Sequence, residues 1–195
     1  GTIGRSYQLA LDISSGPEKV VGRWISQPEM LRQVPTLDSI KVRLLDQNSQ
    51  PPAFTEGLFA LGYFQEIPGE GDFLRIRRQI NDSLFQRDIF AVEDEGVDGF
   101  YFGRSPIPPI GVYGPLEGQK PRSEADTFHA RLESITGDYF AFLNLLSDQI
   151  NVGTPFDAPP ALVVGNIVNV SDTSRYAFGY FRASATSSAS TTYLP

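Results

Sequence analysis

Apolar and polar residues alternate over several stretches of the chain, which predicts strands with one buried face, because every second side chain of a strand points the same way. Strands are expected at residues 7–13, 37–45, 54–64, 73–80, 84–92 and 128–136. The first strand is followed by the turn residues Ser14 to Pro17 and then by "KVVGRWIS". This order predicts a hairpin over residues 5–26.

One stretch carries the longer period of a helix. Its apolar residues recur three and four positions apart, at Tyr139, Leu143, Leu146 and Ile150. Such spacing lines one face of a helix. The hydroxyl of Thr136 is placed to cap the first turn, and Asp138 follows where the helix dipole favours a negative charge. The pattern predicts one packed helix near residues 137–150.

Residues 161–185 predict two apolar strands around a polar turn, and each strand contains a glycine. Glycine inside a strand usually marks a bulge or a close approach of the backbone, so we expect one of these at Gly165. At Gly179 we expect the missing side chain to leave room for the helix. Tyr139 or Phe142 would then pack over the last strand.

Together these elements predict a mainly β fold, an immunoglobulin- or fibronectin-like β-sandwich with one packed α-helix. Pro28 and Pro35 mark a linker between two parts of the chain. Residues 1–34 are expected to form the terminal hairpin of an N-terminal β domain plus this linker. Residues 35–195 are expected to form the sandwich domain with the helix. The abrupt start of the first hairpin indicates a fragment or a processed chain.

Charge and composition narrow the possible functions. The 195 residues carry a formal net charge of −7, and the one basic cluster is Arg75 to Arg78. Nucleic acids need a larger Lys/Arg surface, so no nucleic-acid partner is expected. The chain has no cysteine, which excludes disulfides, thiolate catalysis and cysteine-type zinc sites. No apolar run approaches the roughly 20 residues of a membrane-spanning helix.

The acidic stretch "EDEGVDG" is the candidate for a metal site. Its carboxylates Glu93, Asp94 and Asp98 supply the oxygen ligands that Ca²⁺ prefers, and its glycines allow a tight wrap. The spacing of an EF-hand is absent. A solvated acidic turn between two strands is the alternative, and no other cofactor is expected.

Two further groups of residues offer binding or catalysis. Tyr101, Phe102 and Tyr113 flank a proline-rich loop and are candidates for contacting a partner, with local packing as the alternative. His129 is the only histidine, and it lies in a predicted strand. A nucleophilic triad would need an activated serine and an orienting carboxylate around it, so no catalytic residue is expected.

Several of these segments resemble one family. The most specific block is "PFDAPP" followed by "GNIVN" and "GYFRAS", which covers Pro155, Phe156, Pro159, Pro160, Gly165, Asn166, Ile167, Asn169 and Gly179 to Ser184. Earlier matches are Gly4, Tyr7, Leu9 and Leu11, then Pro35, Asp38 and Ser39, then Gly71 to Phe73 with Asn81, and then Asp94, Asp98 and Gly99. These motifs are similar to those of the Bacteroidota cell-envelope lipoproteins known as domain of unknown function 4249.

The resemblance implies a lipid-anchored protein of the outer membrane, facing the periplasm or the cell surface, often encoded beside a TonB-dependent transporter. It would meet the membrane only through a lipid anchor that this sequence lacks. The expected function is therefore a non-enzymatic module that binds a ligand, a transporter or another envelope protein. A hydrolase acting on glycans or peptides and a purely structural scaffold are the alternatives.

Overall fold

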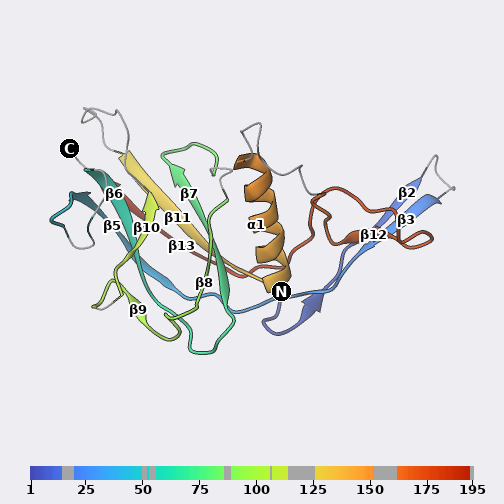
Figure 1. Ribbon diagram of the computed structural model, residues 1–195, viewed down its shortest axis with the longest axis horizontal. Helices are drawn as coiled ribbons and strands as arrows, with labels where there is room; N and C mark the ends of the chain where they lie inside the picture. Colours follow the sequence, from blue (N-terminus) through green and yellow to red (C-terminus); the bar gives the residue numbers. More distant parts are fainter. Residues whose placement is uncertain are drawn as a thin grey trace. The chain divides into compact units, whose positions relative to one another are not determined.

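The computed structural model describes residues 1–14, 20–49, 52, 56–85, 89–105, 107–113, 126–151 and 162–193. The chain folds into two compact units, which Figure 1 shows together with their helix and strands. Unit 1 comprises Gly1–Gln33 and Ile135–Ala185, and unit 2 comprises Val34–Ser134 and Thr186–Pro195. In the described residues no helix is long and apolar enough to cross a membrane.

Unit 2 is a β-sandwich of two four-stranded sheets. In the first sheet β6 pairs with three strands, namely β5, β9 and β10; the bounds are β5 Leu37–Leu45, β6 Gly57–Gln65, β9 Tyr101–Phe102 and β10 Ile110–Tyr113. The second sheet has the order β13-β11-β7-β8; the bounds are β7 Phe73–Ile80, β8 Ala91–Glu93, β11 Asp126–Ile135 and β13 Thr186–Tyr193.

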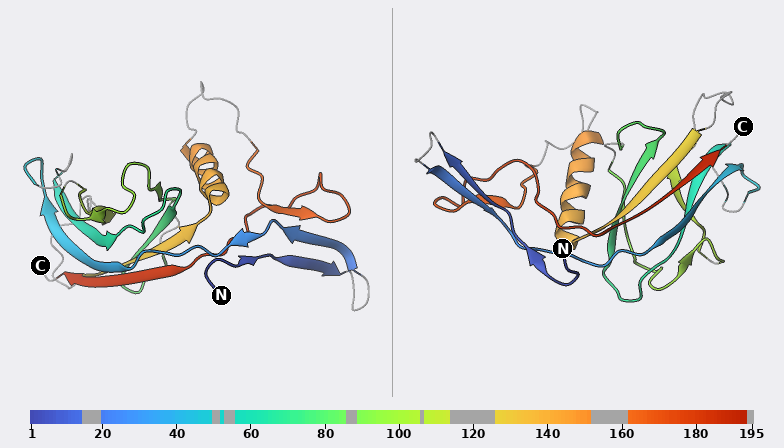
Figure 2. Two further views of the ribbon diagram at one scale, coloured as in Figure 1. Left: turned by 90° about the horizontal axis from the view of Figure 1, so that it is seen from below. Right: turned by 180° about the vertical axis from the view of Figure 1, so that it is seen from behind.

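The core of unit 2 lies between the two sheets, and both contribute alternate residues to it. The first sheet supplies Leu37, Ile40, Ala60 and Phe64, and the second supplies Leu74, Ile76, Phe128, Ala130 and Leu132. Strands β5 and β13 run side by side where the sheets meet (Figure 2), and the backbone N–H of Leu37 donates to Ser187 Oγ at 2.8 Å. The period-two pattern therefore directs alternate residues of each sheet into this core, while Leu45, Leu61 and Tyr63 of the first sheet form a second buried cluster.

The predicted fold class is confirmed as mainly β, with a sandwich and a helix at Gly137–Asn151 (α1). Strands predicted at 37–45 and 73–80 have the bounds of β5 and β7. Of the strand predicted at 84–92, residues 86–88 lie outside the described residues, and the described part pairs with β7 at Ala91–Glu93 (β8). The proline-rich stretch contains one more strand than expected, because Ile110–Tyr113 pairs with β6 between the prolines.

Unit 1 contains the rest of the regular structure, including the one helix in the described part of the chain. Its strands are β1 Ser6–Tyr7, β2 Ala10–Ser14, β3 Val20–Ser26, β4 Glu29–Met30 and β12 Ile167–Asn169. The predicted hairpin is present as β2 and β3, in which Leu11 faces Trp24. Strand β12 extends this hairpin on its other side, with Ile167 opposite Ser26, so the C-terminal part of the chain pairs with the N-terminal part.

A buried carboxylate joins these two parts of unit 1. Glu29 is only 3% exposed. Its carboxylate accepts hydrogen bonds from Thr136 Oγ1 at 2.7 Å, Tyr180 Oη at 2.8 Å and Asn166 Nδ2 at 3.3 Å. Burial, and then the bond to Glu29, raise the pKa of the Tyr180 phenol well above its usual value. Three neutral donors from three distant segments therefore solvate one buried carboxylate.

The glycines of the C-terminal stretch have two different roles. A Cβ at Gly165 would overlap the carbonyl oxygen of Gly179, so the expected close approach of the backbone is present. Nothing lies near a Cβ at Gly179, whose φ of +110° is the feature that requires glycine. The expectation that Gly179 makes room for the helix is therefore wrong. The aromatic residue that packs on Tyr139 and Phe142 is Tyr180, with ring centroids 4.9 and 5.1 Å away.

The two units divide the chain differently from the domains expected from the sequence. The change of unit after Gln33 falls beside the expected boundary at residue 34, but Ile135–Ala185 clusters with the N-terminal segment and not with the sandwich. The pairing of β12 with β3 and the bonds to Glu29 explain this difference. The last sandwich strand is the Ser/Thr-rich β13, whereas residues 178–184, expected to be a strand, have no regular structure.

Candidate functional site

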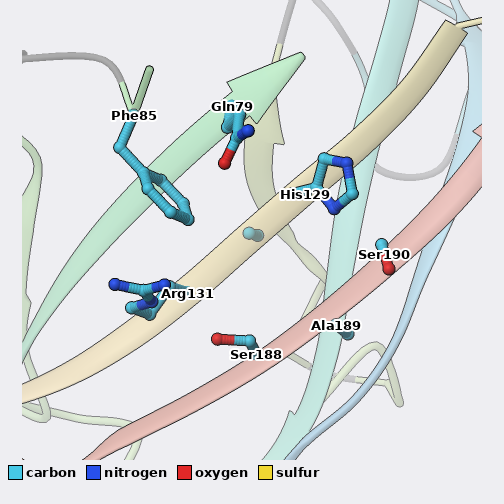
Figure 3. Close-up of a pocket in the computed structure, with 8 residues that line it drawn as sticks. Gln79, Phe85, His129, Arg131, Ser188, Ala189 and Ser190 are labelled. Atoms are coloured by element: carbon cyan, nitrogen blue, oxygen red, sulfur yellow. The ribbon is translucent and has the colours of Figure 1, made fainter. Parts of the chain in front are cut away.

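A shallow pocket of about 230 Å³ opens on the face of the β13-β11-β7-β8 sheet that points away from the core of unit 2. Its polar lining comes from three strands, and one aromatic ring comes from the segment after β7 (Figure 3). The side chains that line it include Gln79, Phe85, His129, Arg131, Ser188 and Ser190.

Strand alternation explains why these residues share a face. On β11, Ala130 is buried in the core, so its neighbours His129 and Arg131 project to the opposite side. The antiparallel register places His129 opposite Ser190 and Arg131 opposite Ser188. Directly opposed side chains lie about 5 Å apart at Cβ, so the imidazole, the guanidinium and two hydroxyls form one continuous polar surface.

Phe85 holds two arginines on this face. The guanidinium carbon of Arg131 lies 4.3 Å from the centroid of its ring, and that of Arg77 on β7 lies 5.7 Å away. Such cation–π contacts stabilise by about 0.5–1 kcal/mol each at exposed positions. No ion pair joins either arginine to a carboxylate in the described residues. The pocket therefore presents positive charge that no ion pair within the described residues engages.

The chemistry of this surface is hydrogen bonding. Guanidinium groups donate only, the Gln79 amide and the serine hydroxyls both donate and accept, and the imidazole joins them. A Ser-His-carboxylate triad would need an acidic side chain to orient His129. Ser190 lies opposite His129, but the described residues that line the pocket include no carboxylate. The arrangement is suited to recognising a polar ligand.

The acidic loop lies elsewhere in unit 2, and its carboxylates bind backbone. Asp94 accepts the N–H groups of Gly71 and Asp72, at 3.0 and 3.2 Å from Oδ2, and Asp98 Oδ1 accepts that of Gly69 at 2.7 Å. In the other direction, Glu66 Oε2 accepts the N–H of Gly99 at 2.6 Å. These bonds fasten residues 93–99 to the loop at residues 68–72.

Glu66 is the buried carboxyl beside these two loops. Its side chain is buried, and burial is the main reason why the pKa of its carboxyl is raised, with the charges of Asp72 and Asp94 adding to the effect. The hydrogen bonds from the backbone N–H groups of Gly99 and Ile67 act in the opposite direction. The native fold therefore binds a proton at Glu66 more tightly than the unfolded chain does.

The predicted calcium site finds no support in this geometry. Asp94 and Asp98 are directed to different backbone donors, and Glu93 belongs to strand β8. Within the described residues, no group of three or more Asp, Glu, His or Cys is arranged so that it could hold a metal ion. The carboxylates of this loop instead hold two turns together by hydrogen bonds to backbone N–H groups.

The predicted partner-binding aromatics also have contacts inside the fold. Phe102 stacks on the buried ring of Phe64, with centroids 4.6 Å apart. Tyr101 donates its hydroxyl to Asp38 Oδ2 at 3.0 Å, and Arg104 lies over its ring at 5.2 Å. These contacts account for both rings by local packing, which was the alternative. The side chain of Tyr113 lies outside the described residues.

The sequence did not reveal the pocket, because its residues are far apart in the chain. Arg77 and Arg131 are brought together by the pairing of β7 with β11, and Ser188 and Ser190 by the pairing of β11 with β13. One signal was present. The cluster Arg75 to Arg78 places arginines two positions apart on the polar side of one strand, and His129 and Arg131 are two positions apart on the polar side of another.

Comparison with known proteins identifies the family but assigns no activity. Searches of curated proteins and of solved structures found no match. The family described as Domain of unknown function (DUF4249) matches residues 2–190, which is nearly the whole chain. The match spans both units, including the buried carboxylate of unit 1 and the pocket of unit 2. The chain therefore belongs to the DUF4249 family.

Proposed function

We propose that this protein is a non-enzymatic binding module of the cell envelope, and that it recognises its ligand on the outward face of β7, β11 and β13. The observation that carries this proposal is the open pocket lined by Gln79, His129, Arg131 and the β13 serines. It collects donors and acceptors on a rigid sheet, which is how proteins position the polar groups of a binding site.

The envelope setting is part of the proposal and has its own support. The motifs quoted above, from Gly4 to Ser184, are similar to those of Bacteroidota outer-membrane lipoproteins. On this basis the module is lipid-anchored to the outer membrane and works beside a TonB-dependent transporter in nutrient uptake. The transporter or another envelope protein is then its macromolecular partner, and the pocket takes the ligand.

A binding screen with two matched variants tests the proposal. The chain is applied to an array of bacterial and dietary glycans and of short peptides. Ser190→Tyr fills the pocket with a ring and leaves the charge unchanged, whereas Thr192→Tyr places the same ring two residues further along the same face of β13. We expect binding that Ser190→Tyr abolishes and Thr192→Tyr retains. Equal binding by both variants, or no binding by the wild type, would contradict a ligand site at this position.

A further inference from the structure

The inference concerns the chemical class of the ligand, and it rests on the proposed function, since it addresses the same pocket. The protein has a formal net charge of −7, yet this face gathers cationic side chains. Arg77 from β7 and Arg131 from β11 meet at Phe85, and His129 lies on the same side of β11 as Arg131. A positive patch on an acidic protein points to a negatively charged ligand.

The contact with Phe85 leaves the donors of Arg131 available. A cation–π contact uses no hydrogen-bond acceptor, and the guanidinium of Arg131 donates no hydrogen bond to another residue in the described part of the chain. At Arg77 the Nε atom is buried and has no hydrogen-bond partner within the described residues. Phe85 therefore orients two guanidinium groups whose charge the described structure does not neutralise.

The two carboxylates that β11 carries besides its arginine make no ion pair with Arg131 or Arg77. Glu133, the next residue but one after Arg131 on β11, is 3% exposed and makes no ion pair with either arginine. Asp126, at the other end of β11, accepts a hydrogen bond of 2.9 Å from Asn81. An acidic group of the ligand would thus meet the arginines without competition from these side chains.

The neighbouring strand offers a second kind of contact. On β13 the outward positions are exposed hydroxyl residues, namely Thr186, Ser188, Ser190 and Thr192. Ser188 stands opposite Arg131 and Ser190 opposite His129, so the row of hydroxyl groups runs beside the arginine and the histidine. Such a row matches a hydroxylated ligand better than an apolar one.

We infer that the pocket binds an oxyanion, the carboxylate of an acidic saccharide or a phosphate group, between Arg131, Arg77 and His129. A planar carboxylate or a phosphate matches the paired N–H donors of a guanidinium, and these charge-assisted bonds are about twice as strong as neutral ones. The hydroxyls of β13 contact the sugar that carries the anion.

His129 provides the test, because it is the only histidine and its ring Hε1 proton gives one isolated NMR signal from the pocket. The intact chain is titrated with methyl β-D-glucuronide, with methyl β-D-glucoside and with inorganic phosphate. The two saccharides differ only in the carboxylate. We expect the glucuronide to shift the His129 signal saturably, with the glucoside about tenfold weaker or more. A shift of the signal with phosphate but not with the glucuronide would show that the bound anion is a phosphate group.

Matched arginine variants locate the anion. Arg131→Gln is expected to lower about tenfold the affinity for the probe that shifts the His129 signal. Arg77→Gln removes the second positive charge beside the ring of Phe85. Arg104→Gln is the control, because Arg104 also lies over an aromatic ring of unit 2 but outside the pocket. Equal titration by glucuronide and glucoside would overturn the oxyanion and leave ligand binding intact. An unshifted His129 signal with all three probes, or full affinity in both the Arg131→Gln and the Arg77→Gln variant, would also overturn it.

Discussion

The carboxylate of Glu29 accepts a 2.8 Å hydrogen bond from the phenol of Tyr180, which lies 151 residues further along the chain. Thr136 and Asn166 complete the hydrogen bonding of the same carboxylate. Segments from the start, the helix cap and the C-terminal stretch are therefore joined at one buried charge. We expect this network to be a main determinant of the stability of unit 1.

Tyr180→Phe removes one donor and leaves the ring in place. The buried carboxylate would then lose a charge-assisted hydrogen bond, so we expect the free energy of unfolding to fall by about 1.5–3 kcal/mol. Tyr176→Phe is the matched control, since its hydroxyl makes no hydrogen bond to any described residue and its ring contacts the exposed Phe178. Urea unfolding of both variants gives the comparison. Equal stability of the two would show that the bond to Glu29 contributes nothing.

Gly165→Ala tests the close approach of the two C-terminal segments. The added methyl would overlap the carbonyl oxygen of Gly179, which belongs to backbone and must move, so we expect a loss of about 2 kcal/mol or more. Gly111→Ala is the control, because its Cβ would meet open space. Thermal unfolding measures both. A Gly165→Ala variant as stable as the control would contradict the packing of Gly165 on Gly179.

Glu66→Gln tests the buried carboxyl beneath the acidic loop. Burial raises the pKa of Glu66, so the native state binds the proton more tightly than the unfolded state does. The free energy of unfolding therefore falls as the pH rises from the pKa of Glu66 in the unfolded chain to its pKa in the folded chain. The glutamine has no proton to lose and keeps an oxygen that can accept from Gly99. We therefore expect the stability of Glu66→Gln, relative to wild type, to increase from about pH 4 to about pH 7.

Urea unfolding at the two pH values gives this difference, and Glu70→Gln on the same loop serves as the exposed control. The control is expected to track the wild type at both values. A constant difference between Glu66→Gln and the wild type would mean that Glu66 does not titrate differently in the folded and unfolded chains.

Phe102→Ala separates packing from partner binding at the proline-rich loop. Its ring stacks on the fully buried Phe64, so we expect truncation to destabilise the protein by about 2–4 kcal/mol. Phe100 is 47% exposed, and Phe100→Ala is expected to change stability by less than about 1 kcal/mol. Both are measured by urea unfolding. Similarly small losses of stability in both variants would contradict a packing role for Phe102 and favour its role in contacting a partner.

The sequence predicted those parts of the fold that depend on local pattern. The bounds of β5, β7 and α1 follow from hydrophobic periodicity, because each element buries one face. Strand β13 was missed, since "TSSASTTY" has no apolar alternation: its partly buried side is formed by Ser187, Ala189, Thr191 and Tyr193. The apolar stretch at residues 178–184 predicted a strand, but Asn166 binds both backbone groups of Phe181 and no ladder forms there.

The candidate site was harder to predict for a related reason. The sequence drew attention to clusters of neighbouring residues, such as the acidic run and the aromatics of the proline-rich loop. In the structure Asp98 instead accepts a hydrogen bond from the N–H of Gly69 and so joins two turns. Phe102 packs on the buried ring of Phe64. The pocket depends on which strands pair, and strand pairing between β7 and β11 is not visible in local periodicity.

The central claim is that this protein recognises its ligand on the outward sheet face of unit 2 and not on its loops. The most direct measurement is a map of backbone amide chemical shifts during titration with the ligand that the array identifies. The account predicts that the changes concentrate on β7, β11 and β13 around Gln79, His129 and Ser190. Changes confined to residues 93–102, or to unit 1, would contradict it.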